Sequence, residues 1–228
     1  MTLRTLPEGR SRKEGPAVSK SLAEQAYDHL EEMIVTLQLK PGSILNESAL
    51  TQQIGFGRTP VREALLRLSD VGLISIVPRR GTLVTTTDRD DQLLLLEVRR
   101  ELERLIASKA AARRDALAKR AFEEMALDMR EASRTDDYLL FLRVDHRFNQ
   151  FVATTSANRH LIKAIMPIHA LARRFWYMHY RPYDLPTAAT LHAVIMEAIA
   201  AGDAAAAGRA SDMLLDYVEN FTRAVPCP

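Results

Sequence analysis

The chain has 228 residues, of which 47% are hydrophobic and 26% are charged, a balance typical of globular rather than disordered or fibrous proteins. Its formal net charge is only +2, so charge alone gives no argument for a nucleic-acid partner. Apolar runs such as Leu93–Leu96 are far too short to cross a membrane, and the first residues lack the apolar core of a signal peptide. The single cysteine excludes an intrachain disulfide, so we expect a cytoplasmic protein.

The N-terminal quarter of the chain predicts two helices after an unstructured segment. Residues 1–20 are rich in Arg, Lys, Gly, Pro and Ser and lack apolar periodicity, which predicts a disordered arm. Ser21 is a suitable N-cap for a first helix, which the Pro41–Gly42 turn is expected to end. A short second helix is predicted from about Glu47, and Gly55 ends it.

A third helix and a hairpin follow, and both are basic. Thr59 suits the N-cap and Pro60 the first helical position. The i, i+3, i+4, i+7 spacing predicts a buried face made of Val61, Ala64, Leu65 and Leu68. Arg58 and Arg62 then point to solvent. Gly72 ends this helix, and the β-rich runs 73–77 and 82–86 predict a hairpin whose tip is Pro78-Arg79-Arg80-Gly81.

A basic helix followed by a basic hairpin is the arrangement that a winged helix-turn-helix uses to hold DNA, so we predict such a domain over residues 21–87. The first turn of a recognition helix meets base edges in the major groove, where arginine pairs with guanine. Thr59 and the free amides of that turn suit a phosphate, and Arg80–Gly81 can approach a backbone or minor groove. The alternative is a solvated face on which the arginines pair with Glu63 and Asp70.

Beyond the polar segment Thr85–Asp88, a natural hinge, the pattern predicts an all-helical bundle over residues 88–223. Its first helix is predicted to bury Leu94, Val98, Leu102, Leu105 and Ile106. Further helices are expected near residues 115–133, 136–155, 158–180, 187–201 and 203–223. The predicted fold class is therefore mainly α, an N-terminal winged helix-turn-helix plus a C-terminal all-helical bundle whose interior can hold a ligand or metal.

Residues 21–86 resemble the DNA-binding domain of GntR-family transcriptional regulators. The resemblance is carried by Leu39-Lys40-Pro41-Gly42, by Leu45–Leu50 and, most specifically, by Arg58-Thr59-Pro60-Val61-Arg62-Glu63-Ala64-Leu65. It implies that Arg58 and Arg62 contact operator bases and that Ser48 contacts DNA from the second helix. It also implies that Arg80 and Gly81 form the wing-tip contacts.

Residues 88–223 resemble the helical effector domain of the FadR-like branch of that family, the FCD domain. The matching motifs are Glu97–Glu103, Asp145-His146-Arg147-Phe148-Asn149, and His192–Ile199 followed by Gly202-Asp203. Many such domains bind a divalent metal through one Asp and three His, for which Zn, Ni or Mn is chemically reasonable.

The resemblance implies a damaged metal site in this chain. Asp145 and His192 are kept, but Asn149 replaces the second ligand and Leu214 falls where the fourth is expected. Compensation would have to come from one of three nearby side chains: His146, Asp212 or Asp216. Otherwise Asp145 and His192 are buried polar residues bonded to each other or to water, or they line a metal-free effector pocket with Asn149.

Arg99 lies on an otherwise apolar helix face, where a buried guanidinium needs an anion. The resemblance implies that Arg99 meets the carboxylate of an organic acid, and a salt bridge to Glu103 or Asp145 is the alternative. The candidate effector-binding residues are thus Arg99, Asp145, Asn149 and His192. A further aromatic and basic cluster could wall a pocket or form a dimer surface; it comprises Arg173, Arg174, Trp176, Tyr177, His179 and Tyr180.

Together these features predict a ligand-responsive transcriptional regulator, with repression as the expected mode. It would bind double-stranded operator DNA as a homodimer and sense a small carboxylate or related metabolite. The alternative from another class is a metal-dependent enzyme on a helical bundle that uses Asp145 and His192. No nucleophile–base spacing supports that alternative, so we predict no catalytic residue.

Overall fold

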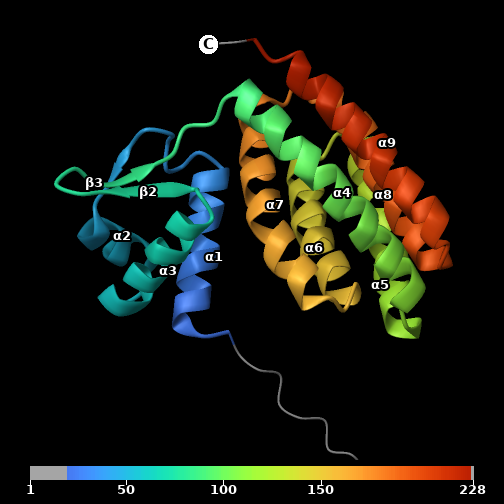
Figure 1. The fold of residues 1–228 in the computed structure, drawn as a ribbon, viewed down its shortest axis with the longest axis horizontal. Coiled ribbons are helices and arrows are strands. Elements are labelled where there is room, and N and C mark those ends of the chain that lie inside the picture. The colour runs from blue at the N-terminus through green and yellow to red at the C-terminus, as the bar shows by residue number, and fades with distance from the viewer. Residues whose placement is uncertain (1–19, 227–228) are drawn as a thin grey trace, which may run out of the picture.

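The computed structural model describes residues 20–226, which form nine α-helices and a three-stranded sheet. The N-terminal unit contains α1 (Leu22–Val35), β1 (Ile44–Leu45), α2 (Glu47–Ile54), α3 (Arg58–Asp70), β2 (Ile74–Val77) and β3 (Gly81–Val84). The bundle contains α4 (Arg89–Arg113), α5 (Ala116–Thr135), α6 (Tyr138–Thr155), α7 (Arg159–His179), α8 (Leu185–Ala201) and α9 (Ala204–Arg223), with a 3-10 turn at Pro182–Asp184. The predicted fold class is confirmed (Figure 1). The predicted arm of residues 1–20 lies, except for Lys20, outside the described residues.

The starts of the first two helices and the end of α2 are where the sequence predicts them, but α1 ends at Val35, well before the Pro41–Gly42 turn that was expected to end it. Ser21 and Glu24 form a reciprocal capping box at the start of α1, in which each side chain binds the other's backbone N–H. Asn46 caps α2 by accepting a hydrogen bond from the Ala49 amide. Gly55 ends α2 at a φ of 73°, a left-handed conformation that glycine adopts without a steric penalty.

The predicted start of α3 is wrong by a few residues. The N-cap is Gly57 rather than Thr59, so Arg58 is already helical and Pro60 occupies the third helical position. Pro60 is tolerated there because first-turn amides have no intrahelical partner, and its missing N–H costs nothing. The buried face of α3 is confirmed: Val61, Ala64, Leu65 and Leu68 are all at most 2% exposed.

The sheet has the strand order β1-β3-β2, with both pairings antiparallel. The β2–β3 hairpin closes at the pair Val77 and Gly81, and Arg79 in the turn takes a left-handed φ of 64°. The sequence did not predict β1, because two residues are too few to show an alternating pattern. The hairpin projects away from the bundle as a wing (Figure 1).

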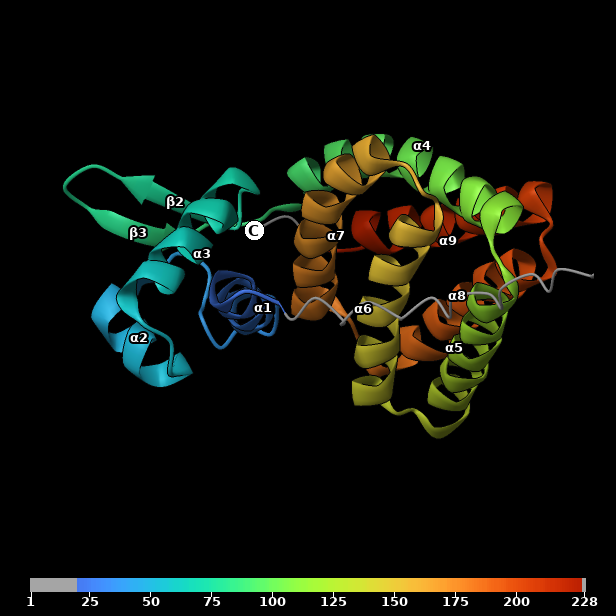
Figure 2. The ribbon, with the colours of Figure 1, turned by 90° about the horizontal axis from the view of Figure 1, so that it is seen from below.

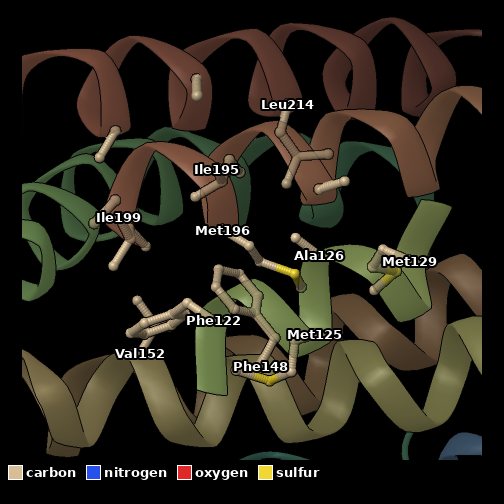
Figure 3. Packing of buried hydrophobic residues seen from close by; sticks show 14 of the residues in the cluster. Phe122, Met125, Ala126, Met129, Phe148, Val152, Ile195, Met196, Ile199 and Leu214 are labelled. Carbon is tan, nitrogen blue, oxygen red and sulfur yellow. The ribbon is translucent and has the colours of Figure 1, made fainter. Parts of the chain in front are cut away.

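The bundle has its own apolar core, which Figure 3 shows from close by. Phe122 and Met125 of α5 pack with Phe148 of α6 and Met196 of α8, and each of these side chains is at most 5% exposed. Leu214 of α9 joins the same cluster at 1% exposure. Leu214 is therefore a packing residue of the core. Within residues 20–226, no helix combines the length and the apolar character needed to cross a membrane.

The predicted inward face of α4 is largely wrong. Leu94, Val98 and Leu105 are 63%, 55% and 42% exposed, whereas Ile106 is buried as predicted. The buried side of α4 also includes Arg99, which is 8% exposed. This helix has apolar residues at helical spacing on two faces, so periodicity alone does not decide which face meets the bundle. An exposed apolar stripe is left along α4.

Helix α7 joins the two units. Its residue Ala170 belongs to the buried core of the N-terminal unit, beside α1 and α3 residues. Arg174 is 1% exposed and donates from Nη1 to the backbone carbonyl and to the hydroxyl of Thr85, both at 3.0 Å. Figure 2 shows α1 between the rest of the N-terminal unit and α7. The segment predicted as a hinge is thus held at its first residue by α7.

Candidate DNA-binding surface and effector cavity

The predicted DNA contacts lie on one exposed set of elements. Arg58, Thr59 and Arg62 occupy the first turns of α3, and all three are exposed. Ser48 is exposed on the first turn of α2. At the wing, Arg80 lies in the turn before β3 and Gly81 is its first residue; both are exposed. The structure thus leaves every one of these side chains or backbones accessible.

The side chain of Arg62 is oriented by an ion pair to α2. Its Nη2 lies 3.4 Å from Oε2 of Glu47, and the two side chains are 72% and 46% exposed. Exposed pairs of this kind contribute little to stability, so a guanine edge or a phosphate can displace Glu47 without a large penalty. The pairing of the α3 arginines with Glu63 and Asp70, the alternative for a solvated face, is not what the structure has at Arg62.

The predicted effector-binding residues line one cavity inside the bundle. Arg99 of α4, Asp145 and Asn149 of α6, and His192 of α8 all face it. Residues of α7 and α9 complete the lining, including His169, Arg173, Trp176 and Leu214. The cavity is about 40 Å³ in volume, which is room for only a few water molecules. A metabolite would therefore have to move some of these side chains in order to bind.

Asp145 is the centre of a buried network in the cavity wall. Nδ2 of Asn149 donates to its Oδ1 at 3.1 Å, and Nε2 of His192 lies 3.2 Å from the same oxygen. Burial alone would raise the pKa of Asp145, but the hydrogen bond and charge of His192, with the charges of Arg173 and Arg99, hold it well below its usual range. Asp145 is thus an ionised carboxylate inside the protein.

His192 contacts an oxygen acceptor with each ring nitrogen. Nδ1 lies 2.8 Å from the carbonyl oxygen of Ala188, and Nε2 faces Asp145. The Asp145–His192 pair is therefore the hydrogen-bonded buried pair that was one of the alternatives from the sequence.

A second buried network holds Arg99. Its Nε lies 2.6 Å from Oε1 of Glu103, and Nε2 of His169 lies 3.1 Å from the same oxygen. Burial opposes ionisation of Glu103, but Arg99 and His169 together lower its pKa to about 2. Arg99 thus forms the salt bridge to Glu103 that was the alternative to a free carboxylate-binding group. Glu103 was expected as a partner of Arg99, but His169 was not expected at the cavity, because its contact with Glu103 joins two helices that are far apart in the chain.

The residues present do not fit the metal site that the resemblance implies. Asn149 directs a donor N–H toward Asp145, His192 has both nitrogens engaged, and Leu214 offers only carbon. The three possible substitutes bond elsewhere: His146 to Arg173, Asp212 to Arg104, and Asp216 to Arg100. Within residues 20–226 there is no group of three His, Cys, Asp or Glu side chains placed to hold a metal ion.

Comparison with known families gives two matches along the chain. The family described as bacterial regulatory proteins, gntR family, matches residues 22–84, and the FCD domain matches residues 94–217. The HTH-type transcriptional repressor RspR of Escherichia coli K12 is 26% identical over 206 residues, which is 89% of each chain. The E. coli protein McbR/YncC has a similar fold, with a TM-score of 0.74 at 22% identity over 87% of this chain and 95% of that one.

Other relatives match over shorter stretches. A Streptomyces ambofaciens HTH-type regulator is 42% identical over 62 residues, 27% of this chain and 26% of its own length. The Bacillus subtilis regulator YdhC is 29% identical over 139 residues, 60% of this chain and 62% of its own length. The gntR family and the relatives named above are described as regulatory proteins, which favours regulation over the alternative of an enzyme that uses Asp145 and His192.

Proposed function

The chain belongs to the gntR family of bacterial regulatory proteins and carries an FCD domain, and from this premise we propose that it is a transcriptional repressor released by a small carboxylate. Residues 21–87 bind operator DNA and residues 88–223 bind the effector. The observation that carries the proposal is that one chain contains both an α3 with exposed arginines and, in the adjoining bundle, a buried cavity lined by polar side chains. Repression is supported by the printed names of two relatives, RspR and a probable D-xylose utilization operon repressor of Paenarthrobacter nicotinovorans.

DNA binding is assigned to α3 and the wing. Arg58 and Arg62 project from the first turns of α3, where a recognition helix reaches base edges. Thr59 and Ser48 supply hydroxyls for phosphates, and the Arg80–Gly81 tip supplies a cation beside an accessible backbone. Since DNA is the partner, the protein works in the cytoplasm.

The effector is assigned to the cavity lined by Arg99, Asp145, Asn149 and His192. A carboxylate fits its chemistry because guanidinium groups from two different helices, those of Arg99 and Arg173, face the cavity. A metal ion has no role in this proposal.

The active species is a homodimer, which presents two α3 helices to successive major grooves. The exposed stripe of Leu94, Val98 and Leu105 on α4 supports this assignment, because its spacing of four and seven residues is that of a helix–helix seam. Val98→Glu should therefore convert the dimer into a monomer in sedimentation equilibrium. A dimer that persists at the same affinity would assign the interface elsewhere.

The test of DNA binding is a gel shift on the DNA upstream of the protein's own gene, at two salt concentrations. Arg58→Ala or Arg62→Ala should reduce discrimination against non-specific DNA by about 1–3 kcal/mol, which is about 5- to 150-fold. Arg120→Ala, which removes an exposed arginine of α5, is the matched control and should leave binding unchanged. Wild-type specificity in both α3 variants would refute the proposal.

A further inference from the structure

Arg173 lies between the cavity and the DNA-binding unit. From α7 its Nε points toward the cavity carboxylate of Asp145, with Nε and Oδ2 3.7 Å apart. Its Nη1 and Nη2 lie 3.4 Å from Oε1 of Glu31 and Oε2 of Glu32, which belong to α1. The guanidinium also lines a groove between α1 and the bundle, so one side chain forms the partition between the cavity and that groove.

Arg173 lies near three carboxylates but forms a short ion pair with none of them. Charge-assisted pairs with good geometry have N–O distances of about 2.7–2.9 Å, and all three carboxylate distances here are longer. The short contact is to a neutral acceptor, with Nη1 donating to Nδ1 of His146 at 2.8 Å. Among the described residues, Nε of Arg173 has no hydrogen-bond partner. Small changes on either side can therefore shift the guanidinium from one carboxylate to another.

Glu31 depends on Arg173 more than Glu32 does. The side chain of Glu31 is 12% exposed, whereas that of Glu32 is 54% exposed. Burial raises the pKa of Glu31, and the charge of Arg173 opposes that effect. A buried carboxylate that loses its cation is destabilised until it reaches water or takes up a proton.

Glu31 in turn lies beside a residue that contacts the third helix. Tyr27 precedes Glu31 by four residues, about one turn, on the same face of α1, and the charge of Glu31 adds to burial in raising the pKa of the Tyr27 hydroxyl. Above the Tyr27 ring lies Arg67 of α3, with Cζ 4.5 Å from the ring centroid. A row of neighbouring side chains thus runs from Asp145 through Arg173, Glu31 and Tyr27 to Arg67 of α3.

We propose that an anion in the cavity pairs with Arg173 and withdraws its guanidinium from Glu31 and Glu32, which frees α1 and α3 from the bundle. This inference rests on the proposed function for the roles of DNA and effector. The anion binds more tightly when Arg173 faces the cavity, and operator binds more tightly when Arg173 holds α1; each state excludes the other. Occupancy of the cavity therefore weakens operator binding.

The first experiment needs neither DNA nor effector. Hydrogen exchange of α1 amides is compared in the wild type, Arg173→Gln, and the double variant Arg173→Gln with Glu31→Gln. Arg173→Gln should speed α1 exchange by roughly tenfold or more, since it leaves Glu31 buried without a cation. The added Glu31→Gln should restore most of the protection, because the buried carboxylate of α1 that has lost its cation is then absent.

A purely steric role of Arg173 predicts a different result, in which the double variant exchanges as fast as Arg173→Gln or faster. That result would overturn the inference, as would unchanged exchange in Arg173→Gln. Arg159→Gln, an exposed arginine at the start of the same helix, is the control and should exchange like the wild type.

The second experiment uses Trp176, the single tryptophan of the chain, which lines the cavity. A panel of aliphatic mono-, di- and hydroxycarboxylates is titrated against its fluorescence, with the corresponding neutral amides as controls. A carboxylate that changes the fluorescence should weaken operator binding of the wild type by about 5- to 150-fold. In Glu31→Gln the same carboxylate should change the fluorescence with an affinity within about threefold, yet shift operator binding by less than about twofold.

Three results of this experiment have separate meanings. A full operator shift in Glu31→Gln would overturn the coupling through Arg173. Fluorescence changes by amides but by no carboxylate would overturn the anionic occupant. Failure of the wild type to form a specific operator complex would refute the proposed function, while the exchange experiment still decides whether Arg173 holds α1.

Discussion

Arg174 should contribute more to the attachment of the two units than any surface ion pair. It is 1% exposed and has no carboxylate partner among the described residues; its acceptors are Thr85, Leu73 and Thr86. Two of its hydrogen bonds, both to Thr85, are 3.0 Å long, and the two others, at 3.5 Å, are at the limit of the range and add little. The substitution Arg174→Met removes these donors while keeping much of the volume.

The size of the effect follows from the two short bonds. Hydrogen bonds to a charged group contribute about 1.5–3 kcal/mol each, so the pair contributes about 3–6 kcal/mol in total. Burial opposes the charge, as shown by the lowered pKa of Arg174, so part of that gain is offset. We therefore expect Arg174→Met to lower the free energy of unfolding by about 2–3 kcal/mol, and Tm by roughly 4–12 °C.

The assay is urea unfolding followed by helical circular dichroism and by Trp176 fluorescence. Arg120→Met, at an exposed position of α5, is the control and should unfold like the wild type. Arg174→Lys should fall between, because an ammonium keeps the charge but lacks the planar fork. If Arg174→Met unfolds within about 0.5 kcal/mol of the control, these hydrogen bonds are worth no more than those the unfolded chain makes to water.

Three further predictions concern the bundle. Zinc should leave the melting temperature of the chelator-treated wild type unchanged. It should raise the melting temperature of the double variant Asn149→His with Leu214→His by several degrees, because two imidazoles then join Asp145. An equal rise in both proteins would contradict the damaged metal site. The pKa of Glu103, about 2, lies below the ordinary value of 4.5 for a glutamate. Glu103 therefore stabilises the fold above pH 4.5, and about 3 kcal/mol of this is lost as pH falls from 4.5 toward 2. Urea unfolding between pH 3 and 6 should therefore show a flatter pH dependence in Glu103→Gln than in the wild type, and parallel profiles would count against the ion pair. Phe122 has 0% exposure, so Phe122→Ala should lower the free energy of unfolding by about 3–5 kcal/mol. Leu127 is 69% exposed on the same helix, so Leu127→Ala should unfold like the wild type. Similar urea midpoints for the two variants would refute the packing at Phe122.

Local signals in the sequence predict most of the helices well. Caps and glycines act within a few residues of themselves, so Ser21 and Gly55 mark helix ends without knowledge of the rest of the fold. The same signals misplace the start of α3, since glycine at position 57 is a weak cap in sequence but suits the extended conformation found there. The short strand β1 exists only because β3 pairs with it.

The cavity was predicted in part, and the missing part is long-range. Asp145 and Asn149 are four residues apart on one helix, so their shared face follows from helix geometry. His169 meets Glu103 only after two helices dock, and a pairing across 66 positions has no signature in a single sequence. The prediction for Leu94 and Val98 fails for a related reason, because an exposed apolar stripe on a helix has the same spacing as a stripe that packs in the core.

Arg173 and Arg174 are neighbours in sequence, yet one reaches α1 and the other reaches Thr85 at the end of the sheet. Successive side chains on a helix diverge by about 100°, so the two arginines contact the N-terminal unit from different directions. These two polar attachments accompany the apolar packing of Ala170 in the core of the N-terminal unit. If Arg173 loosens while Arg174 stays bound, Thr85 is the polar attachment that remains, and the N-terminal unit should rotate near that residue.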